Sequence, residues 1–202
     1  MATVTYLTID DFERLPPEQA KNHELVNGEL VPEPGRTARH NLTLVEVIVL
    51  LESFVREHRL GQTILGQAFD FGGDALGPDV SFFGPAKSAL VELDKRVQRF
   101  VPDLAIEIVS ADDMFNSLVR KKERYRNCGT EEVWIVEPEA REVLIYSARG
   151  DRILREDAEL TSELLPGFRM PVKRLFEAAN GCTHPPAPVS GAAPKAPGPQ
   201  NK

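Results

Sequence analysis

Val101-Pro102-Asp103-Leu104-Ala105-Ile106-Glu107-Ile108-Val109-Ser110 is the part of the chain from which its architecture can best be inferred. Branched apolar residues dominate this segment, Pro102 stands near its start, and polar residues follow from Ser110 onward. The pattern predicts a short strand with both faces buried, rather than a helix. Because an unpaired buried charge is costly, Glu107 needs a partner, which is either a metal ion or a cationic side chain.

The spacing of the two acids in this strand limits what they can do together. Side chains alternate between the faces of a strand, so Asp103 and Glu107 lie on the same face. At about 3.3 Å per residue they are about 13 Å apart, whereas metal–oxygen bonds measure about 2–2.5 Å. A second carboxylate for a metal at Glu107 must therefore come from a neighbouring strand. The alternative is that Glu107 forms an ion pair with an arginine.

Composition indicates an ordinary globular protein with one sizeable core. The chain has 202 residues, of which 42% are hydrophobic and 27% are charged. No apolar run is long enough to span a bilayer, and residues 1–17 lack the pattern of a secretion signal. Cys128 and Cys182 form neither a disulfide framework nor a zinc motif. We therefore expect a cytoplasmic protein without membrane segments.

The charge balance argues against a large non-specific nucleic-acid surface. Acidic residues outnumber lysine and arginine by 31 to 24, which gives a formal charge of −7, whereas nucleic-acid-binding surfaces are usually basic. A local basic patch or a bound metal ion remains compatible with this balance. Arg36, Arg39 and His40 are candidates for a small patch of this kind. His40 itself is expected at a helix cap or on the surface.

Local motifs predict the elements that precede the central strand. Thr8 begins a short helix that ends before Pro16. Asn27-Gly28, between two Glu-Leu-Val triplets, predicts a β-hairpin over residues 23–31. Thr37 caps a long helix that runs to about Arg59, with Gly61 at its carboxyl end. We expect strands over 62–71 and 78–83, separated by a glycine-rich turn, and a mostly irregular segment over 87–98.

The central strand is followed by a second helix and two more strands. Asp112 or Asp113 caps the helix, which ends at Cys128 because Gly129 stops it. The strands are expected over 131–136 and 141–146, and a last short helix over 171–179.

This order of elements predicts a single domain over residues 1–182. Its fold class is α/β, with a mixed central sheet flanked by helices and an added N-terminal hairpin. Residues 183–202 are rich in proline, alanine and glycine, and we expect them to form a disordered tail. The chain has no glycine-rich phosphate loop, no Gly-x-Ser-x-Gly elbow and no paired histidines at helical spacing. The classes of enzyme that depend on one of these motifs are therefore excluded.

Two carboxylates meet if the strand that follows Pro78-Asp79 lies beside the central strand. Asp79 and Glu107 are then able to bind a hard divalent cation on one face of the sheet. Mg²⁺ fits, with Mn²⁺ as the alternative, because one or two protein carboxylates commonly hold Mg²⁺ while waters and substrate phosphate complete the octahedron. Such an ion polarises a phosphodiester and lowers the pKa of its bound water. A nearby lysine would help to orient that water.

The chain carries, in this order, residues 24–30, Pro78-Asp79-Val80, residues 102–110, Lys121, Tyr125, Gly129 and residues 132–138. Together these motifs resemble the PD-(D/E)XK nuclease superfamily and, more narrowly, its Uma-type restriction endonuclease family. The resemblance covers about residues 5–178, and it implies a restriction endonuclease-like fold. It further implies that Asp79 and Glu107 bind metal, that Lys121 assists the attacking water and that Glu24 adds a third carboxylate.

The position of the lysine departs from the superfamily pattern. That pattern places it two residues after the second acid, where this chain has Val109. The Uma-type family is similar in carrying the lysine on the following helix, which points to Lys121. Helical spacing alone leaves the choice open, because different choices of apolar face turn either Lys121 or Lys122 toward the sheet. We prefer Lys121 and keep Lys122 as the second candidate.

Three other residues near these motifs receive a structural interpretation. Asp103 either pairs with Arg99 or accepts hydrogen bonds from backbone N–H groups. Tyr125 and Trp134 occupy inward positions of regular elements, so we expect them to pack in the core rather than to stack on bases.

The sequence therefore predicts a Mg²⁺-dependent endonuclease that hydrolyses DNA phosphodiester bonds by metal-activated water. A homodimer is expected, because two sites are needed to cut both strands together. The displaced lysine and the acidic charge favour an alternative, a catalytically weak or inactive binding or assembly module with the nuclease fold. Metal-assisted hydrolysis of a small phosphorylated ligand is a third hypothesis.

Overall fold

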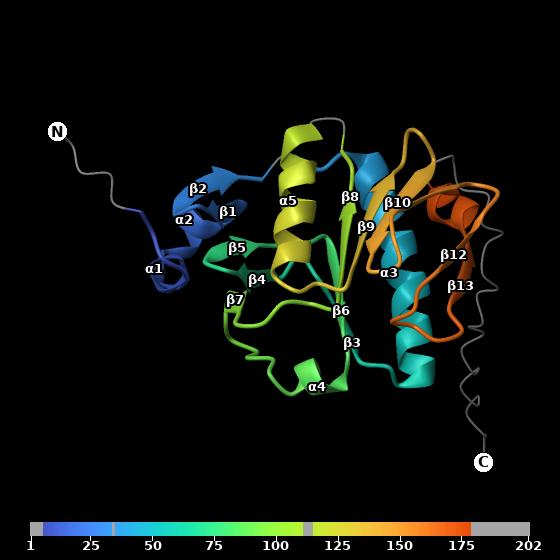
Figure 1. The fold of residues 1–202 in the computed structure, drawn as a ribbon. Helices are drawn as coiled ribbons and strands as arrows, with labels where there is room; N and C mark the ends of the chain where they lie inside the picture. Colours follow the sequence, from blue (N-terminus) through green and yellow to red (C-terminus); the bar gives the residue numbers. More distant parts are fainter. Residues whose placement is uncertain (1–5, 34, 111–114, 179–202) are drawn as a thin grey trace, which may run out of the picture.

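A six-stranded mixed sheet forms the centre of the molecule in the computed structural model, which describes residues 6–33, 35–110 and 115–178 (Figure 1). The strand predicted within residues 101–110 is observed as Leu104–Ile108 in the interior of this sheet, and all five of these residues are buried, which confirms the prediction. Outside the described residues lie the predicted tail over 183–202, Cys182 and the candidate caps Asp112 and Asp113. The strand order is β11 (Arg152–Arg155), β10 (Glu142–Ser147), β9 (Glu132–Glu137), β8 (Leu104–Ile108), β6 (Val80–Phe83) and β3 (Gln62–Leu65).

A second sheet of five strands lies beside the first and contains the predicted hairpin. Asn27 and Gly28 form the hairpin turn with φ of 50° and 80°, the left-handed pair that a tight hairpin needs. The order is β2 (Glu29–Pro32), β1 (His23–Val26), β5 (Asp74–Leu76), β4 (Ala68–Phe71) and β7 (Val97–Gln98).

The prediction of one strand over 62–71 is wrong. The segment forms β3 and β4, which belong to different sheets, and Gly66 with φ of 56° lies between them. The predicted glycine-rich turn contains β5, and the segment over 87–98 ends in β7. These strands have only two to four residues each, so their partners in the sheet stabilise them more than their own sequence does.

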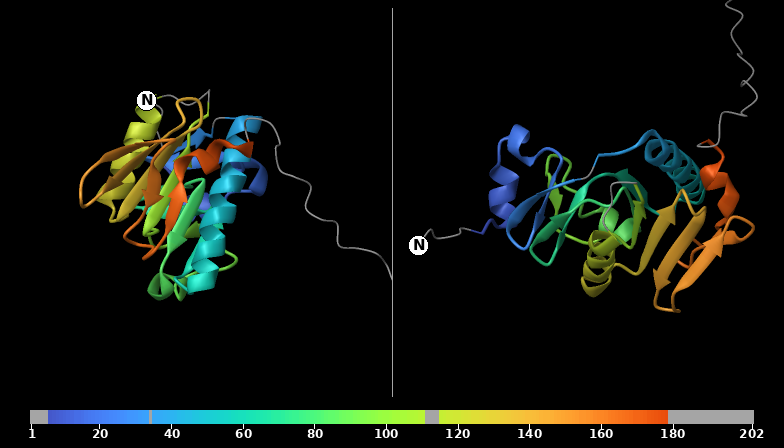
Figure 2. Two further views of the ribbon diagram at one scale, coloured as in Figure 1. Left: turned by 90° about the vertical axis from the view of Figure 1, so that its right-hand side faces the viewer. Right: turned by 90° about the horizontal axis from the view of Figure 1, so that it is seen from above.

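Helices cover both faces of the six-stranded sheet, as predicted (Figures 1 and 2). Helix α3 (Ala38–His58) buries Val47, Leu51 and Val55 against the face that carries Ile106, and α5 (Phe115–Asn127) packs on the opposite face. No helix among the described residues is both long and apolar enough to cross a membrane. The smaller elements are α1 (Ile9–Arg14), α2 (Pro17–Ala20), α4 (Pro85–Ser88), β12 (Glu159–Thr161), β13 (Arg169–Pro171) and a 3₁₀ helix, η1 (Val172–Phe176).

The predicted amino-terminal cap of α3 is observed, whereas its carboxyl-terminal cap is not Gly61. The Thr37 hydroxyl accepts a hydrogen bond from the His40 backbone N–H at 3.2 Å, which confirms the predicted amino-terminal cap. The carboxyl-terminal cap is Arg59, which adopts φ of 53° and lies two residues before the predicted cap Gly61. Gly61 is required for another reason: with φ of 150°, an added Cβ would lie 2.1 Å from the Phe83 carbonyl oxygen.

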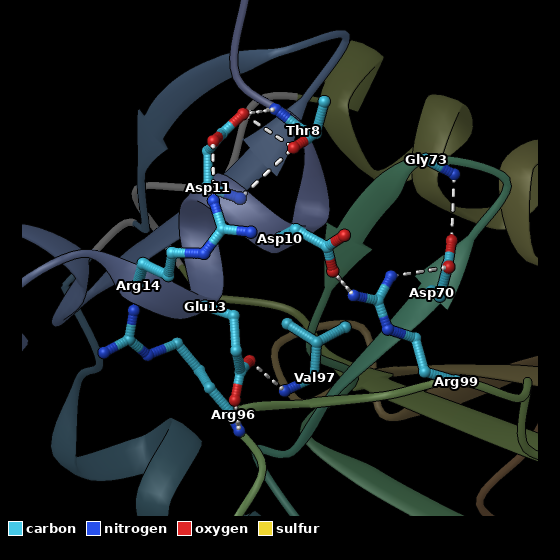
Figure 3. A network of polar contacts seen from close by, with 10 residues as sticks. All are labelled: Thr8, Asp10, Asp11, Glu13, Arg14, Asp70, Gly73, Arg96, Val97 and Arg99. Carbon is cyan, nitrogen blue, oxygen red and sulfur yellow. Dashed lines mark hydrogen bonds and ion pairs between the residues drawn. The ribbon is translucent and has the colours of Figure 1, made fainter.

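Polar contacts attach α1 to the five-stranded sheet (Figure 3). The Glu13 carboxylate accepts hydrogen bonds from the backbone N–H groups of Arg96 and Val97, at 2.9 and 3.1 Å. Arg99 forms ion pairs with Asp10 and Asp70, so the expected pairing of Arg99 with Asp103 is wrong.

The other interpretation of Asp103 is confirmed. Its Oδ2 accepts a hydrogen bond from the Gly84 backbone N–H at 2.8 Å, and Lys87 pairs with its Oδ1. Asp103 is therefore a structural residue at the far end of β8 from Glu107.

Candidate active site

The pairing of β6 with β8 brings Asp79 and Glu107 together. The strands run antiparallel with Val80 opposite Ile106, so Asp79, one residue before β6, lies opposite Glu107. Alternation along each strand directs both carboxylates to the same face of the sheet. Both are nearly buried, with side chains only 7% and 9% exposed, and both line one cavity of about 70 Å³.

Asp79 is held as a carboxylate by its neighbours. Its Oδ2 accepts hydrogen bonds from His40 Nε2 at 3.2 Å and from the Ile108 backbone N–H at 2.9 Å, and its Oδ1 lies 3.0 Å from Arg36 Nη2. Burial opposes ionisation of Asp79, but the contacts with His40, Ile108 and Arg36 outweigh it and lower the pKa of this carboxyl group below its ordinary value. The group is therefore negatively charged at neutral pH.

For Glu107, the effects that oppose ionisation outweigh those that favour it. The Tyr125 hydroxyl donates a hydrogen bond to Oε1 at 2.5 Å, and Lys121 Nζ lies 3.5 Å from the same oxygen. Burial, reinforced by the charges of Asp79 and Glu24, still raises the pKa of Glu107 to about 8, although Lys121 and Tyr125 favour the charged form. The Glu107 carboxyl group therefore loses its proton at a higher pH than an ordinary glutamate does, mainly because it is buried.

Lys121 bridges two of the carboxylates. Its Nζ lies 2.8 Å from Glu24 Oε1, in addition to its contact with Glu107. Burial disfavours the charge on Lys121, but Glu107 and Glu24 outweigh this effect and raise its pKa above the ordinary value. The group stays an ammonium ion, so it can donate hydrogen bonds but cannot act as a base.

The second lysine candidate lies elsewhere. Lys122 Nζ is 4.6 Å from the centre of the Tyr146 ring and forms an ion pair with Glu123 at 2.5 Å. Neither contact belongs to the cavity that Asp79, Glu107 and Lys121 line. The structure thus brings Lys121, and not Lys122, to the two carboxylates.

Glu24 reaches the cavity from the hairpin, but as a partner of Lys121. Its Oε1 accepts a hydrogen bond from the Gly77 backbone N–H at 3.0 Å, besides the ion pair with Lys121. Among the described residues, no cluster of three or more His, Cys, Asp and Glu side chains is arranged to hold a metal ion. In this structure, the predicted third carboxylate, Glu24, contacts Lys121.

Sequence reasoning missed the contributions of His40 and Tyr125. His40 is 3% exposed and contacts Asp79, so its expected place at a cap or on the surface is wrong. Its spacing to Thr43 and Val47, both buried on α3, was a signal that His40 faces inward. Tyr125 packs in the core, as expected, with its ring 4.5 Å from that of Phe71, but its hydroxyl also holds Glu107.

The residues present fit a divalent cation. Among the described residues, four carboxylates line the cavity, those of Glu24, Glu33, Asp79 and Glu107, together with two permanently charged cationic side chains, Arg36 and Lys121. Burial is the main cause of the raised pKa of Glu107, and the negative charges of Asp79 and Glu24 add to it. Mg²⁺ needs only one or two protein carboxylates, so the opposed pair of Asp79 and Glu107 suits it.

A larger cavity of about 350 Å³ adjoins this site. The two cavities share Glu24, Val31, Ser117 and Lys121. The larger one lies between the β1–β2 hairpin and α5, and Arg120 and Arg124 line it. Its volume lies at the lower end of the range for small-molecule sites, about 300–1,000 Å³.

Comparisons with known proteins agree with this architecture. Residues 9–173 match the model of the Uma2 family, which is described as "Putative restriction endonuclease". Among solved structures, the chain is similar to a protein from Anabaena variabilis ATCC 29413, described as a putative nuclease belonging to DUF820. That similarity has a TM-score of 0.73 at 23% sequence identity, covers 85% of this chain and 98% of the other, and confirms the predicted fold. No curated protein matches the chain.

Proposed function

Since the chain belongs to the Uma2 family of putative restriction endonucleases, we propose that it hydrolyses DNA phosphodiester bonds with the help of a divalent cation, Mg²⁺ or Mn²⁺. The observation that carries this proposal is the convergence of Asp79, Glu107 and Lys121 on one cavity, from two strands and a helix. Asp79 and Glu107 would hold the cation between the opposed ends of their strands. When bound, Mg²⁺ polarises the scissile phosphodiester and lowers the pKa of a water molecule.

Lys121 supplies a fixed positive charge at the site. Its ion pairs with Glu24 and Glu107 hold Nζ at the cavity, and its raised pKa keeps it protonated. An ammonium group in this place can orient the attacking water and stabilise negative charge that develops on the phosphate. Tyr125 holds the Glu107 carboxylate in position through its hydroxyl hydrogen bond.

The adjoining larger cavity offers a path for the substrate strand. Arg120 of α5 lines it and is exposed, so it is able to contact DNA phosphates, whereas Arg124 beside it forms an ion pair with Asp74 at 2.7 Å. Because the whole chain has a formal charge of −7, attraction of a polyanion has to depend on such local groups and on the bound cation. Cleavage of both strands requires two such sites, so we propose a homodimer as the active form.

Calorimetry and plasmid nicking test this proposal on the full-length protein. We expect Mg²⁺ or Mn²⁺ to bind at one site per chain and supercoiled plasmid to be nicked only when the cation is present. Metal binding without cleavage of any DNA or RNA would favour the third hypothesis, metal-assisted hydrolysis of a small phosphorylated ligand. Absence of metal binding would contradict the proposal.

The raised pKa of Glu107 predicts that cation binding strengthens with pH. A proton on Glu107 competes with the cation, so Mg²⁺ affinity should rise up to about tenfold per pH unit from pH 6 to about 8 and then level off. The stability of the metal-free protein, in contrast, should decrease as the pH rises. Its folded state retains a proton that an ordinary glutamate, with a pKa of 4.5, has already lost, so its stability falls as pH rises through this window.

Calorimetry and thermal unfolding at pH 6, 7, 8 and 9 measure both trends. The increase in melting temperature caused by Mg²⁺ should grow from pH 6 to about 8 and then level off. An affinity that does not change between pH 6 and 8 would show that Glu107 is not a ligand with a raised pKa.

A further inference from the structure

The two oxygens of the Asp79 carboxylate have partners of different kinds. Oδ2 accepts two hydrogen bonds, from His40 Nε2 and from the Ile108 backbone N–H. Oδ1 has one charged partner, the Arg36 guanidinium, at 3.0 Å. A cation that binds Asp79 will therefore find Oδ2 already engaged, and it has to take the oxygen that Arg36 occupies.

These partners also differ in how easily they can leave. His40 is 3% exposed on α3, and Ile108 belongs to the central strand β8, so neither can move without disturbing the core. Arg36 lies before the first turn of α3, and its side chain is 39% exposed. The guanidinium can therefore turn into solvent while the fold stays intact, and only a partly exposed ion pair is lost.

We propose that Arg36 is the counter-ion of Asp79 in the metal-free protein, that a divalent cation displaces it from Oδ1, and that the released guanidinium binds a phosphate of the DNA strand. This inference rests on the proposed function. Glu33, at 4.0 Å, is the second acidic partner of Arg36 and keeps the side chain near the cavity after its release. Arginine suits the second task because its planar fork matches the oxygens of a phosphate group.

The first test is calorimetry of the metal-free, full-length protein with MgCl₂ and with MnCl₂. Arg36→Gln removes the competing charge, so we expect it to bind either cation about three- to tenfold more tightly than the wild type. Arg39→Gln is the matched control, because Arg39 is an exposed arginine one turn along the same helix end, and it should stay within about twofold of the wild type. Asp79→Asn should bind neither cation.

The second test measures DNA binding by fluorescence anisotropy of a labelled duplex, with Ca²⁺ in place of Mg²⁺. Arg36→Gln should bind DNA more weakly, and the slope of log affinity against log salt should fall by about one, as for one lost phosphate contact. Arg39→Gln should change the slope less. Should Arg36→Gln not fold, Arg36→Lys keeps the charge with a shorter reach and is expected to give intermediate values in both tests.

The two tests separate failure of this inference from failure of the proposed function. If the wild type binds Mg²⁺ through Asp79 but Arg36→Gln binds it no more tightly, the competition is contradicted and the metal site stands. If Arg36→Gln binds metal more tightly but DNA equally well, the contact with phosphate is contradicted. If the wild type binds neither cation, both this inference and the proposed function fail.

Discussion

Glu107→Gln is expected to abolish Mg²⁺ binding and plasmid nicking while the metal-free protein stays folded. Loss of a ligand carboxylate should weaken the cation at least about 100-fold, since loss of residues that merely support ligands costs about 10–100-fold. The fold should tolerate the change well. The pKa of Glu107 is raised to about 8, so at pH 7 the amide replaces a group that is already mostly uncharged. We expect the free energy of unfolding of the metal-free protein to stay within about 1 kcal/mol of the wild type.

Calorimetry, plasmid nicking and chemical denaturation measure these three outcomes. Glu132→Gln is the matched control, because Glu132 is a buried glutamate on the neighbouring strand β9, outside the cavity. It accepts hydrogen bonds from Trp134 Nε1 at 2.6 Å and from the Ser162 hydroxyl at 2.8 Å. Its loss should cost about 1–3 kcal/mol of stability and leave Mg²⁺ affinity unchanged. Equal loss of metal binding in both variants would contradict a specific role for Glu107.

Lys121→Met should separate catalysis from metal binding. The variant keeps Asp79 and Glu107 and removes a positive charge beside them, so Mg²⁺ should bind at least as tightly as in the wild type. Plasmid nicking should fall about 10²- to 10³-fold, because the donor that stabilises charge on the phosphate is lost. Glu24 would lose its counter-ion and Glu107 a hydrogen-bond donor, so the metal-free protein should be destabilised by about 3–5 kcal/mol.

Lys122→Met is the internal control for this experiment. Lys122 is equally exposed, at 18% for both side chains, but it contacts Glu123 and the Tyr146 ring. It should therefore lose less than about 1 kcal/mol of stability and retain full nicking activity. If Lys122→Met were the variant that lost cleavage, the assignment of the lysine would be wrong. If Lys121→Met lost metal binding together with cleavage, Lys121 would be needed for the structure of the site.

Local sequence patterns were sufficient for the parts of the fold that depend on nearest neighbours. Asn27-Gly28 predicted the hairpin because few residue pairs accept positive φ at both turn positions. The branched apolar run around Ile106 predicted a strand buried on both faces, and Thr37 predicted the start of α3. The alternating pattern of residues 62–71 predicted one strand, but the structure has two, β3 and β4. Their separation depends on which sheet each one joins, and the local pattern does not encode that.

The candidate active site could likewise be predicted only in part from the sequence. The residue types and their order in the sequence pointed to Asp79, Glu107 and a helical lysine, and strand alternation gave the shared face. Only the tertiary structure selected Lys121 over Lys122, because successive residues on a helix differ by about 100° in direction and packing alone fixes the rotation of α5. The contacts of Asp79 with His40 and Arg36, 39 and 43 residues earlier, likewise depend on how the amino-terminal end of α3 meets the start of β6. No local pattern encodes a contact of that kind, since it forms only when separate elements pack together.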